Sequence, residues 1–484
     1  MNTQPSKREL RHFLKRYVPQ PTAASNVDLG LKNRPYANSI PSPKDYVDNL
    51  LMPSYNQIAL TKVEGPFEKS GWLAVGSTLY KLQKLGLTSI VVTDNLTWSN
   101  EKSSSELCKA MIRESMALIE AIEKAGGRAR PIYGCVTEQE SASSVEVNFS
   151  FIQSALDSHH IPIIIPIVSQ PTGMQRPMSA NDTMIALTQN LVKDAHHQMT
   201  PAKIVVINNE GGIPNHERPG TAHSLVNIQE EYDTIVDAFQ RKPAWQQSNP
   251  TALSNLAMIR SCLTHLPTSS SAIIVPTVSL PSALIANLVT DKPLYSSSLP
   301  IHNLQQGSPD LERVNQSRTT VLRHGIKINT YDKLSQLDTD RLTRLLEASF
   351  QRKLDGNAFY GRLERVLAGA IVAGDYEGAV IMTNEDAENV SRSHVYLDKF
   401  AIAPTSQGIG LTDILWRRMC DAYPEILWRS RKDNGVNKWY FERSNGYIRL
   451  KDTNWVVFWH GENGYKNMKD YAHIARSIPA SFST

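Results

Sequence analysis

Five polar side chains late in the sequence could bind an acidic small molecule and move a proton: Lys399, Arg429, Arg431, Asn434 and Tyr440. A dicarboxylate needs two cationic anchors, and an arginine can hold a carboxylate with two parallel hydrogen bonds. An asparagine donates and accepts hydrogen bonds, and a tyrosine hydroxyl can protonate a departing thiolate. The competing interpretation is a set of solvated residues around a loop, which is what charged surface runs usually are.

A glycine turn lies just upstream of these residues. The segment Phe400 to Ala403 alternates like a half-buried strand, Pro404 ends it, and a helix is predicted to run from the turn through Met419. Backbone amides at such a helix start bind a pyrophosphate, which acetyl-CoA carries. A lone G-x-G turn is equally compatible with a simple tight loop. The predicted cofactor contacts are Ile402, Gln407, Gly408, Ile409 and Gly410.

The segments YLDKFAIAPTSQGIG, LWRSRKDN and NKWYFERS resemble the acetyltransferase domain of the N-acetylglutamate synthase family. Looser segments, SKRELRHFLKRY, INNEGGIPNHERPGTAHSLVN, LVTDKPLYSSSLP and VAGDYEGAVI, resemble its fungal mitochondrial members in that order, so the resemblance covers most of the 484 residues. It implies an amino-acid N-acetyltransferase that moves acetyl from acetyl-CoA to the amine of L-glutamate, the first step of arginine biosynthesis.

The resemblance also implies roles for particular residues. Lys399, Arg429, Asn434 and Tyr440 would hold the glutamate, and the last two would also be catalytic. We expect direct attack of the amine on the thioester, because Cys420 falls at the far end of the cofactor helix. No general base is identified, since strand alternation turns Asp398 away from the face of Lys399. Thr405 replaces a residue that is often Gln or Arg in the wider acyltransferases.

The family further implies partners and two alternative functions. Arginine would be an allosteric inhibitor, the chain would form a homo-oligomer, and a complex with acetylglutamate kinase is possible. One alternative function is an arginine-sensing regulatory subunit of that kinase. The other is an active amino-acid kinase.

Composition excludes several classes of protein. A net charge of +4 gives no nucleic-acid footprint, and the longest apolar run, Ile161 to Val168, is too short to span a membrane. Four scattered cysteines predict neither a disulfide framework nor a zinc site, and the His159-His160 and His196-His197 pairs do not suggest a metal. We therefore expect no metal cofactor.

The first residues are basic and amphipathic. Five cations precede residue 17 against only Glu9, and the apolar residues there follow helical spacing. This suits a short mitochondrial presequence within residues 1–40, although the same stretch resembles a helix of the mature family members. Matrix localisation is predicted mainly from the family.

Strands alternate with helices in residues 41–335, which predicts an α/β domain with a mostly parallel sheet. The resemblance implies that this domain is amino-acid-kinase-like and has a regulatory role. The predicted strands are Ser89–Thr93, Arg130–Val136, Ile161–Ser169, Lys203–Asn208 and Ala272–Val275; the predicted helices are Glu106–Ala125, Asp182–His197 and Pro281–Val289. An active kinase would need a glycine-rich phosphate cradle and a lysine on the first strand. The strand through Thr93 instead runs into Asp94-Asn95, and Gly211-Gly212 is interpreted as a structural or regulatory turn.

Residues 336–484 follow the element order of a GNAT-type acetyltransferase domain, after a strand pair predicted near Thr320 to Thr330. The expected order is a helix from Arg341 to Phe350, a hairpin turning at Gly374-Asp375, the cofactor strand and helix, and three further strands. Those strands are Ile426–Ser430, Tyr447–Leu450 and Trp455–His460, with a short helical stretch at Val436–Arg443.

Overall fold

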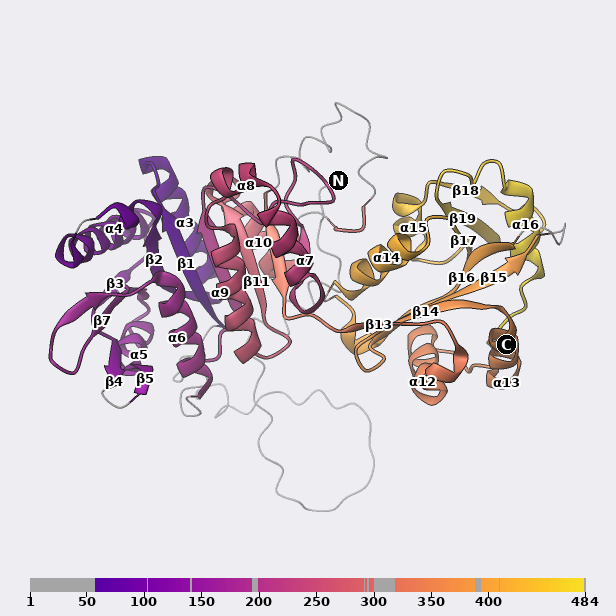
Figure 1. Cartoon of the computed structure of the whole chain (residues 1–484), viewed down its shortest axis with the longest axis horizontal. Helices are drawn as coiled ribbons and strands as arrows, with labels where there is room; N and C mark the ends of the chain where they lie inside the picture. Colours follow the sequence, from indigo (N-terminus) through magenta and orange to yellow (C-terminus); the bar gives the residue numbers. More distant parts are fainter. Residues whose placement is uncertain are drawn as a thin grey trace, which may run out of the picture.

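The computed structural model describes residues 57–101, 103–139, 142–193, 199–290, 292–293, 296–299, 318–387, 393–408 and 410–482. The basic segment predicted within residues 1–40, and Ile409 of the predicted cofactor contacts, lie outside these ranges. Figure 1 shows two α/β units, the first coloured indigo to magenta and the second orange to yellow.

The first unit is built on an eight-stranded sheet of order β10-β12-β11-β9-β1-β2-β6-β3. All neighbouring strands are parallel except β11 and β12, so the predicted α/β class with a mostly parallel sheet is confirmed. The strands are β1 (Gln57–Gly65), β2 (Leu87–Asn95), β3 (Ala129–Ile132), β6 (Ile161–Ile164), β9 (Lys203–Asn208), β10 (Leu225–Asn227), β11 (Ser271–Pro276) and β12 (Thr320–Arg323).

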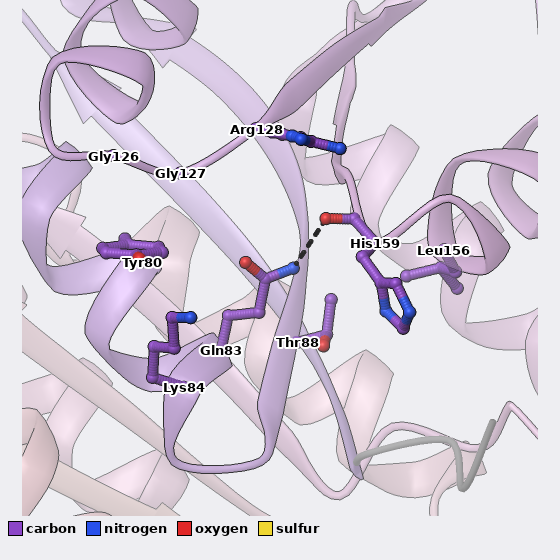
Figure 2. A pocket seen from close by; sticks show the side chains of 9 residues that line it. All are labelled: Tyr80, Gln83, Lys84, Thr88, Gly126, Gly127, Arg128, Leu156 and His159. Atoms are coloured by element: carbon purple, nitrogen blue, oxygen red, sulfur yellow. Dashed lines mark hydrogen bonds between the residues drawn. The ribbon is translucent and has the colours of Figure 1, made fainter. Parts of the chain in front are cut away.

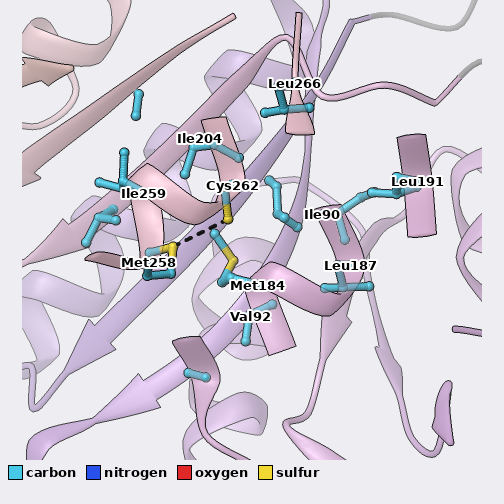
Figure 3. Close-up of a cluster of buried hydrophobic side chains, with 14 of the residues drawn as sticks. Ile90, Val92, Met184, Leu187, Leu191, Ile204, Met258, Ile259, Cys262 and Leu266 are labelled. Atoms are coloured by element: carbon cyan, nitrogen blue, oxygen red, sulfur yellow. Dashed lines mark hydrogen bonds between the residues drawn. The ribbon is translucent and has the colours of Figure 1, made fainter. Parts of the chain in front are cut away.

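Helices form the crossovers that parallel strands require. They are α3 (Lys69–Lys84), α4 (Ser104–Lys124), α5 (Phe149–Asp157), α6 (Ala180–Lys193), α7 (Ile228–Gln240), α8 (Pro243–Ser248), α9 (Ala252–His265) and α10 (Ser282–Thr290). Alternate residues of β2 enter different apolar clusters, with Ile90 and Val92 on one face and Val91 on the other. Figure 3 shows the first cluster, where Met184 and Cys262 pack against the sheet. Burial on both faces explains the continuous apolar runs of these strands.

Two predicted strands are each divided in the structure. Gly134 interrupts Arg130–Val136 with a left-handed φ of 62°, which glycine adopts readily. Pro166 interrupts Ile161–Ser169, because proline has no N–H to donate to a ladder. The second pieces join a small sheet of order β5-β4-β7-β8. Its strands are β4 (Val136–Gln139), β5 (Ala142–Val147), β7 (Ile167–Ser169) and β8 (Gln175–Pro177).

The central strand β1 was not identified from the sequence, so the strand through Thr93 is the second and not the first. β1 carries Lys62, whose side chain is 1% exposed and lies 2.9 Å from Glu64 and 2.8 Å from Asp94. Asn181 and Asn255 also accept hydrogen bonds from its ammonium. Burial alone would lower the pKa of Lys62, but the two carboxylates raise it above its ordinary value. The first-strand lysine of a kinase is therefore present, but its charge is neutralised internally.

Lys62→Met should lower the free energy of unfolding by about 3 kcal/mol or more, because it leaves two carboxylates facing each other without their cation. Lys81→Met, at an exposed site on α3, is the matched control and should change stability by less than about 0.5 kcal/mol. Denaturant unfolding of the intact protein measures both. Equal stability of Lys62→Met and the unsubstituted protein would show that the buried cluster contributes nothing to folding.

The second unit is built on a seven-stranded sheet of order β13-β14-β15-β16-β17-β19-β18, in which only β16 and β17 pair in parallel. Its strands are β13 (Ile328–Tyr331), β14 (Leu367–Ala373), β15 (Gly378–Asp386), β16 (Ser393–Ile402), β17 (Ile426–Arg431), β18 (Gly446–Arg449) and β19 (Trp455–His460). Its helices are α12 (Thr339–Phe350), α13 (Gly356–Val366), α14 (Leu411–Ala422), α15 (Asn437–Arg443) and α16 (Met468–Ser477). The predicted element order is present, and Asp338 caps α12 by accepting from the Arg341 amide at 2.9 Å.

Helices cover both faces of this sheet. Ile371 and Phe458 pack in the cluster beneath α14, whereas their neighbours Val372 and Trp459 pack beneath α12 and α16 respectively. α14 therefore lies on one face, and α12, α13 and α16 lie on the other, as Figure 1 shows for α14 and α12. The face on which a side chain lies decides which ligand groups it can meet.

The change from one sheet to the other comes earlier than expected. β12 pairs with β10 and β11 in the first sheet, and β13 pairs with β14 in the second. The strand pair predicted near Thr320 to Thr330 is thus two strands of different sheets. The passage between units lies between Arg323 and Ile328, ahead of the boundary expected near residue 335.

Candidate active site

The strands β16 and β17 start together and then diverge. Among the described residues, Tyr396 opposite Leu427 is the single pair that joins them. From there β16 continues to Ile402 along β15, while β17 follows β19. The β17-facing backbone of β16 therefore lies outside the ladder beyond Tyr396. An extended chain can add to such an edge through main-chain hydrogen bonds.

The glycine turn between β16 and α14 has the predicted form. Gly408 and Gly410 adopt φ values of 95° and 83°, a left-handed region that favours glycine. A Cβ on Gly408 would meet no atom within 4 Å, so that side of the turn is open. A Cβ on Gly410 would lie 2.8 Å from Leu225 of the first unit. The amides of Asp413 and Ile414 donate to the Gly410 carbonyl at 3.1 and 3.2 Å, so an anion would bind at the amides that come before them. That binding stays a prediction.

A β-bulge overturns the expected orientation of Asp398. Ile381 pairs with Lys399 and the next residue, Met382, pairs with Leu397, so Asp398 is one extra residue in β16. Strict alternation would separate the side chains of Asp398 and Lys399, but the bulge interrupts alternation. The Lys399 ammonium accordingly bonds the Asp398 carboxylate.

Asp398 is held by two cations. Its side chain is 1% exposed, and Arg362 of α13 donates to it at 2.6 Å. Burial alone would raise the pKa of Asp398, but the charges of Lys399 and Arg362 lower it below its ordinary value. A carboxylate stabilised in this way is a poor general base. Sequence reasoning missed Arg362, because nothing in the sequence distinguishes it from other helix-surface arginines.

Lys399 is enclosed by internal partners. Its ammonium donates to the carboxylate and carbonyl of Asp398 and to Ser481 Oγ, the last at 3.1 Å. It also lies over the rings of Phe359 and Phe482, 5.0 and 5.7 Å from the centroids. Ser481 and Phe482 belong to the α16 tail, the name used here for residues Ile478–Phe482. Lys399 is thus a buried cation whose hydrogen bonds go to Asp398 and to this tail.

Arg429 contacts the same tail. Its guanidinium donates to the carbonyls of Ala475, Ile478 and Pro479, the second at 2.8 Å, and stacks on Trp455 at 4.3 Å. A cation at these carbonyls complements the negative end of α16. The structure therefore brings Lys399 and Arg429 to one segment, but it gives Arg429 a structural role that the sequence did not predict.

Asn434 and Tyr440 lie on the other side of β17. Asn434 donates to Ser430 Oγ at 2.9 Å and accepts from the Val436 amide at 3.1 Å, which fixes the turn before α15. The half-buried ring of Tyr440 lies 5.5 Å from Trp428 and 6.3 Å from Trp416 of α14. Burial raises the pKa of Tyr440 to about 12, so its hydroxyl keeps its proton at neutral pH.

The four predicted residues thus form two pairs on opposite faces of the sheet. Trp428 belongs to the cluster under α14, whereas its neighbour Arg429 contacts the end of α16. The cations lie on the α16 face and the two neutral groups lie on the α14 face. The diverging strands β16 and β17 run between them, which is the place where a ligand could meet both pairs.

Two other candidate groups are unsuitable for chemistry. Burial raises the pKa of the Cys420 thiol to about 12, so almost no thiolate exists at neutral pH and it cannot serve as an acyl carrier. Glu442, near Tyr440 in sequence, is paired with Arg443 at 3.3 Å. All four cysteines are free thiols.

The Gly211-Gly212 turn makes bonds within the protein. The amide of Gly211 donates to Asn208 and that of Gly212 to the Arg318 carbonyl. A Cβ on Gly212 would lie 2.1 Å from Thr320 Oγ1. These amides are not available to a phosphate, so the interpretation as a structural turn agrees with the geometry.

A separate hollow of about 300 Å³ lies at the amino ends of β2, β3 and β6 (Figure 2). Gln83 donates across it to the carbonyl of His159, and Lys84 and Arg128 line it. This cationic lining does not suit a guanidinium ligand such as arginine. Within the described ranges, no cluster of His, Cys, Asp and Glu could hold a metal ion, and no helix is long and apolar enough to cross a membrane.

The sequence of the second unit matches a known family model. Residues 329–480 match the N-acetyltransferase domain of N-acetylglutamate synthase. A solved N-acetylglutamate synthase from Neisseria gonorrhoeae is similar over 84% of this chain and 95% of its own, with a TM-score of 0.49 and 10% identity.

Curated relatives match nearly the full length. A mitochondrial amino-acid acetyltransferase of Laccaria bicolor is 35% identical over 95% of this chain and 90% of its own. The corresponding protein of Schizosaccharomyces pombe is 29% identical over 88% of this chain and 89% of its own. The family model covers the glycine turn and all four predicted site residues. The chain therefore belongs to the mitochondrial amino-acid acetyltransferases of fungi, the N-acetylglutamate synthase family.

Proposed function

We propose that the second unit carries out the whole transfer of acetyl from acetyl-CoA to glutamate between β16 and β17. The observation that carries this proposal is the divergence of these strands, with two cations on one face and a protonated tyrosine on the other. Acetyl-CoA would place its pyrophosphate on the amides of the turn at Gly408 and Gly410 and its pantetheine along β16.

Glutamate would be held by its carboxylates at Lys399 and Arg429. Both cations now donate to neutral acceptors of the α16 tail, Ser481 Oγ and backbone carbonyls. A carboxylate forms shorter and stronger hydrogen bonds with these donors than a hydroxyl or a carbonyl does. Glutamate would therefore replace the tail acceptors, with Asp398 keeping the Lys399 ammonium in place.

The neutral amine would then attack the thioester directly, and the tetrahedral intermediate would collapse with release of thiolate. Tyr440 is the proton donor to that thiolate, and Asn434 orients the reacting groups from the same face. The amine proton leaves to solvent, because Asp398 is held by two cations and Glu442 by Arg443.

The first unit would be an amino-acid-kinase-like regulatory domain. Residues 324–327 would connect it to the second unit. We propose that arginine binds to the first unit and inhibits the acetyl transfer. We also propose that the protein is a homo-oligomeric enzyme of the mitochondrial matrix and that it can associate with acetylglutamate kinase.

Release of free CoA by the intact protein, measured with and without glutamate and with and without arginine, tests the proposal. We expect release to require glutamate and to fall with arginine, with inhibition that saturating glutamate does not abolish. Purely competitive inhibition would place arginine in the glutamate pocket. Acyl-phosphate formation from N-acetylglutamate and ATP would support the kinase alternative, and arginine binding without CoA release would support the regulatory-subunit alternative.

A further inference from the structure

Two serines of the first unit reach into the second unit beside its helices. Ser296 and Ser298, which lie between α10 and β12 in the chain, both donate to Asp413 Oδ1, at 2.8 and 2.5 Å. They accept from Arg443, whose Nη2 is 2.8 Å from Ser296 Oγ and whose Nε is 2.6 Å from Ser298 Oγ. Each hydroxyl thus donates to an anion and accepts from a cation. We call these four residues the serine bridge.

Two residues of the serine bridge are buried, and Ser296 and Asp413 are partly buried. Ser298 is 6% exposed and Arg443 is 4% exposed. The direct distance from Arg443 to Asp413 is 3.7 Å, longer than each of the hydrogen bonds that link them through the serines. The hydroxyls therefore add hydrogen bonds to a loose ion pair, and both charged groups would lose part of their compensation without them.

The two charged ends of the serine bridge lie on the two helices that the proposed mechanism uses. Asp413 is the third residue of α14, immediately after the glycine turn. Arg443 is the last residue of α15, three residues after Tyr440 and therefore on a neighbouring part of the helix surface. The two serines of the first unit thus connect the start of α14, which would bind the pyrophosphate, with α15, which carries the proposed proton donor.

The serine bridge also compensates the negative charge of Asp413. An acidic residue in the first turn of a helix repels an anion bound at that helix start, even though it stabilises the helix itself. Here the carboxylate of Asp413 is directed to the two hydroxyls and Arg443, which compensate its charge. Loss of the hydroxyls would leave this anion less compensated beside the pyrophosphate.

We propose that Ser296 and Ser298 are positioning residues for the transfer reaction. They fix the spacing between α14 and α15, and hence between the bound thioester and the Tyr440 hydroxyl. This inference rests on the proposed function, because it assigns the pyrophosphate to the turn before α14. According to this proposal the first unit contributes residues that position the active site, in addition to its regulatory role.

The test compares the double variant Ser296→Ala/Ser298→Ala with Glu231→Gln in the intact protein. Glu231 bonds Arg417 of α14 at 2.6 Å and so also joins the two units, but it touches neither Asp413 nor Arg443. We expect the double variant to raise the KM for acetyl-CoA about tenfold and to lower kcat, with glutamate binding changed less than about twofold. Glu231→Gln should leave both constants within about twofold.

A double-mutant cycle with Tyr440→Phe separates positioning from general destabilisation. If the serines act through the proton donor, their effect on kcat should largely disappear once the tyrosine hydroxyl is gone. Ser296→Thr in place of alanine keeps the hydroxyl and should restore most of the acetyl-CoA affinity. Unchanged constants in the double-alanine variant, or equal losses in Glu231→Gln, would overturn the proposal. Absence of glutamate-dependent CoA release from the unsubstituted protein would instead refute the proposed function.

Discussion

Tyr440→Phe should reduce turnover by about 10²-fold or more while weakening glutamate and acetyl-CoA binding far less. The ring stays among Trp428, Trp416 and Phe458, so the aromatic packing is kept, and only the proton donor to the thiolate is removed. Steady-state constants and direct binding of each substrate measure the effect. Because burial raises the pKa of Tyr440 to about 12, the donor stays protonated as the pH rises beyond the ordinary tyrosine value near 10.

Tyr447→Phe is the matched control for that experiment. Tyr447 is 50% exposed, lies on the edge strand β18 and shares the neighbour Phe458 with Tyr440. We expect it to change turnover less than about twofold. Normal turnover in Tyr440→Phe would show that another group protonates the thiolate. A loss of melting temperature in Tyr440→Phe that exceeds the loss in Tyr447→Phe would point to a packing role.

Arg429→Lys should weaken glutamate binding by on the order of 2 kcal/mol, which is about 30-fold in Kd, with acetyl-CoA affinity nearly unchanged. Lysine keeps the charge but loses the planar pair of donors. The same substitution weakens the bonds to Ile478 and Ala475, so thermal melting must accompany the binding measurement.

Arg431→Lys is the control for Arg429→Lys, since Arg431 lies two residues along β17, is exposed, and has its guanidinium 6.0 Å from the ring of the same Trp455. We expect it to change glutamate binding much less. A larger loss in Arg431→Lys would assign the carboxylate to Arg431 and leave Arg429 as the cap of α16. Weaker acetyl-CoA binding in Arg429→Lys would contradict the carboxylate anchor altogether.

The sequence by itself determined the family, the α/β class and most elements of the second unit. Those elements have strong local signals: Asp338 at a helix start, the Gly374-Asp375 hairpin turn, and paired glycines before α14. Such signals depend on the conformational preferences of a few adjacent residues, so they can be recognised without knowledge of the fold. The four polar residues predicted for the site came from motif resemblance, and their roles stay predictions.

Only the tertiary structure decided how those residues are used. The bulge at Asp398 depends on its register with β15, which no property of β16 alone reveals. The burial of Lys62 requires β1 to lie between β2 and β9, and the α16 tail reaches Lys399 across more than eighty positions of sequence. The serine bridge likewise joins residues that are far apart in the chain. Long-range contacts of this kind are set by how whole sheets and helices pack, whereas sequence patterns report only the preferences of near neighbours.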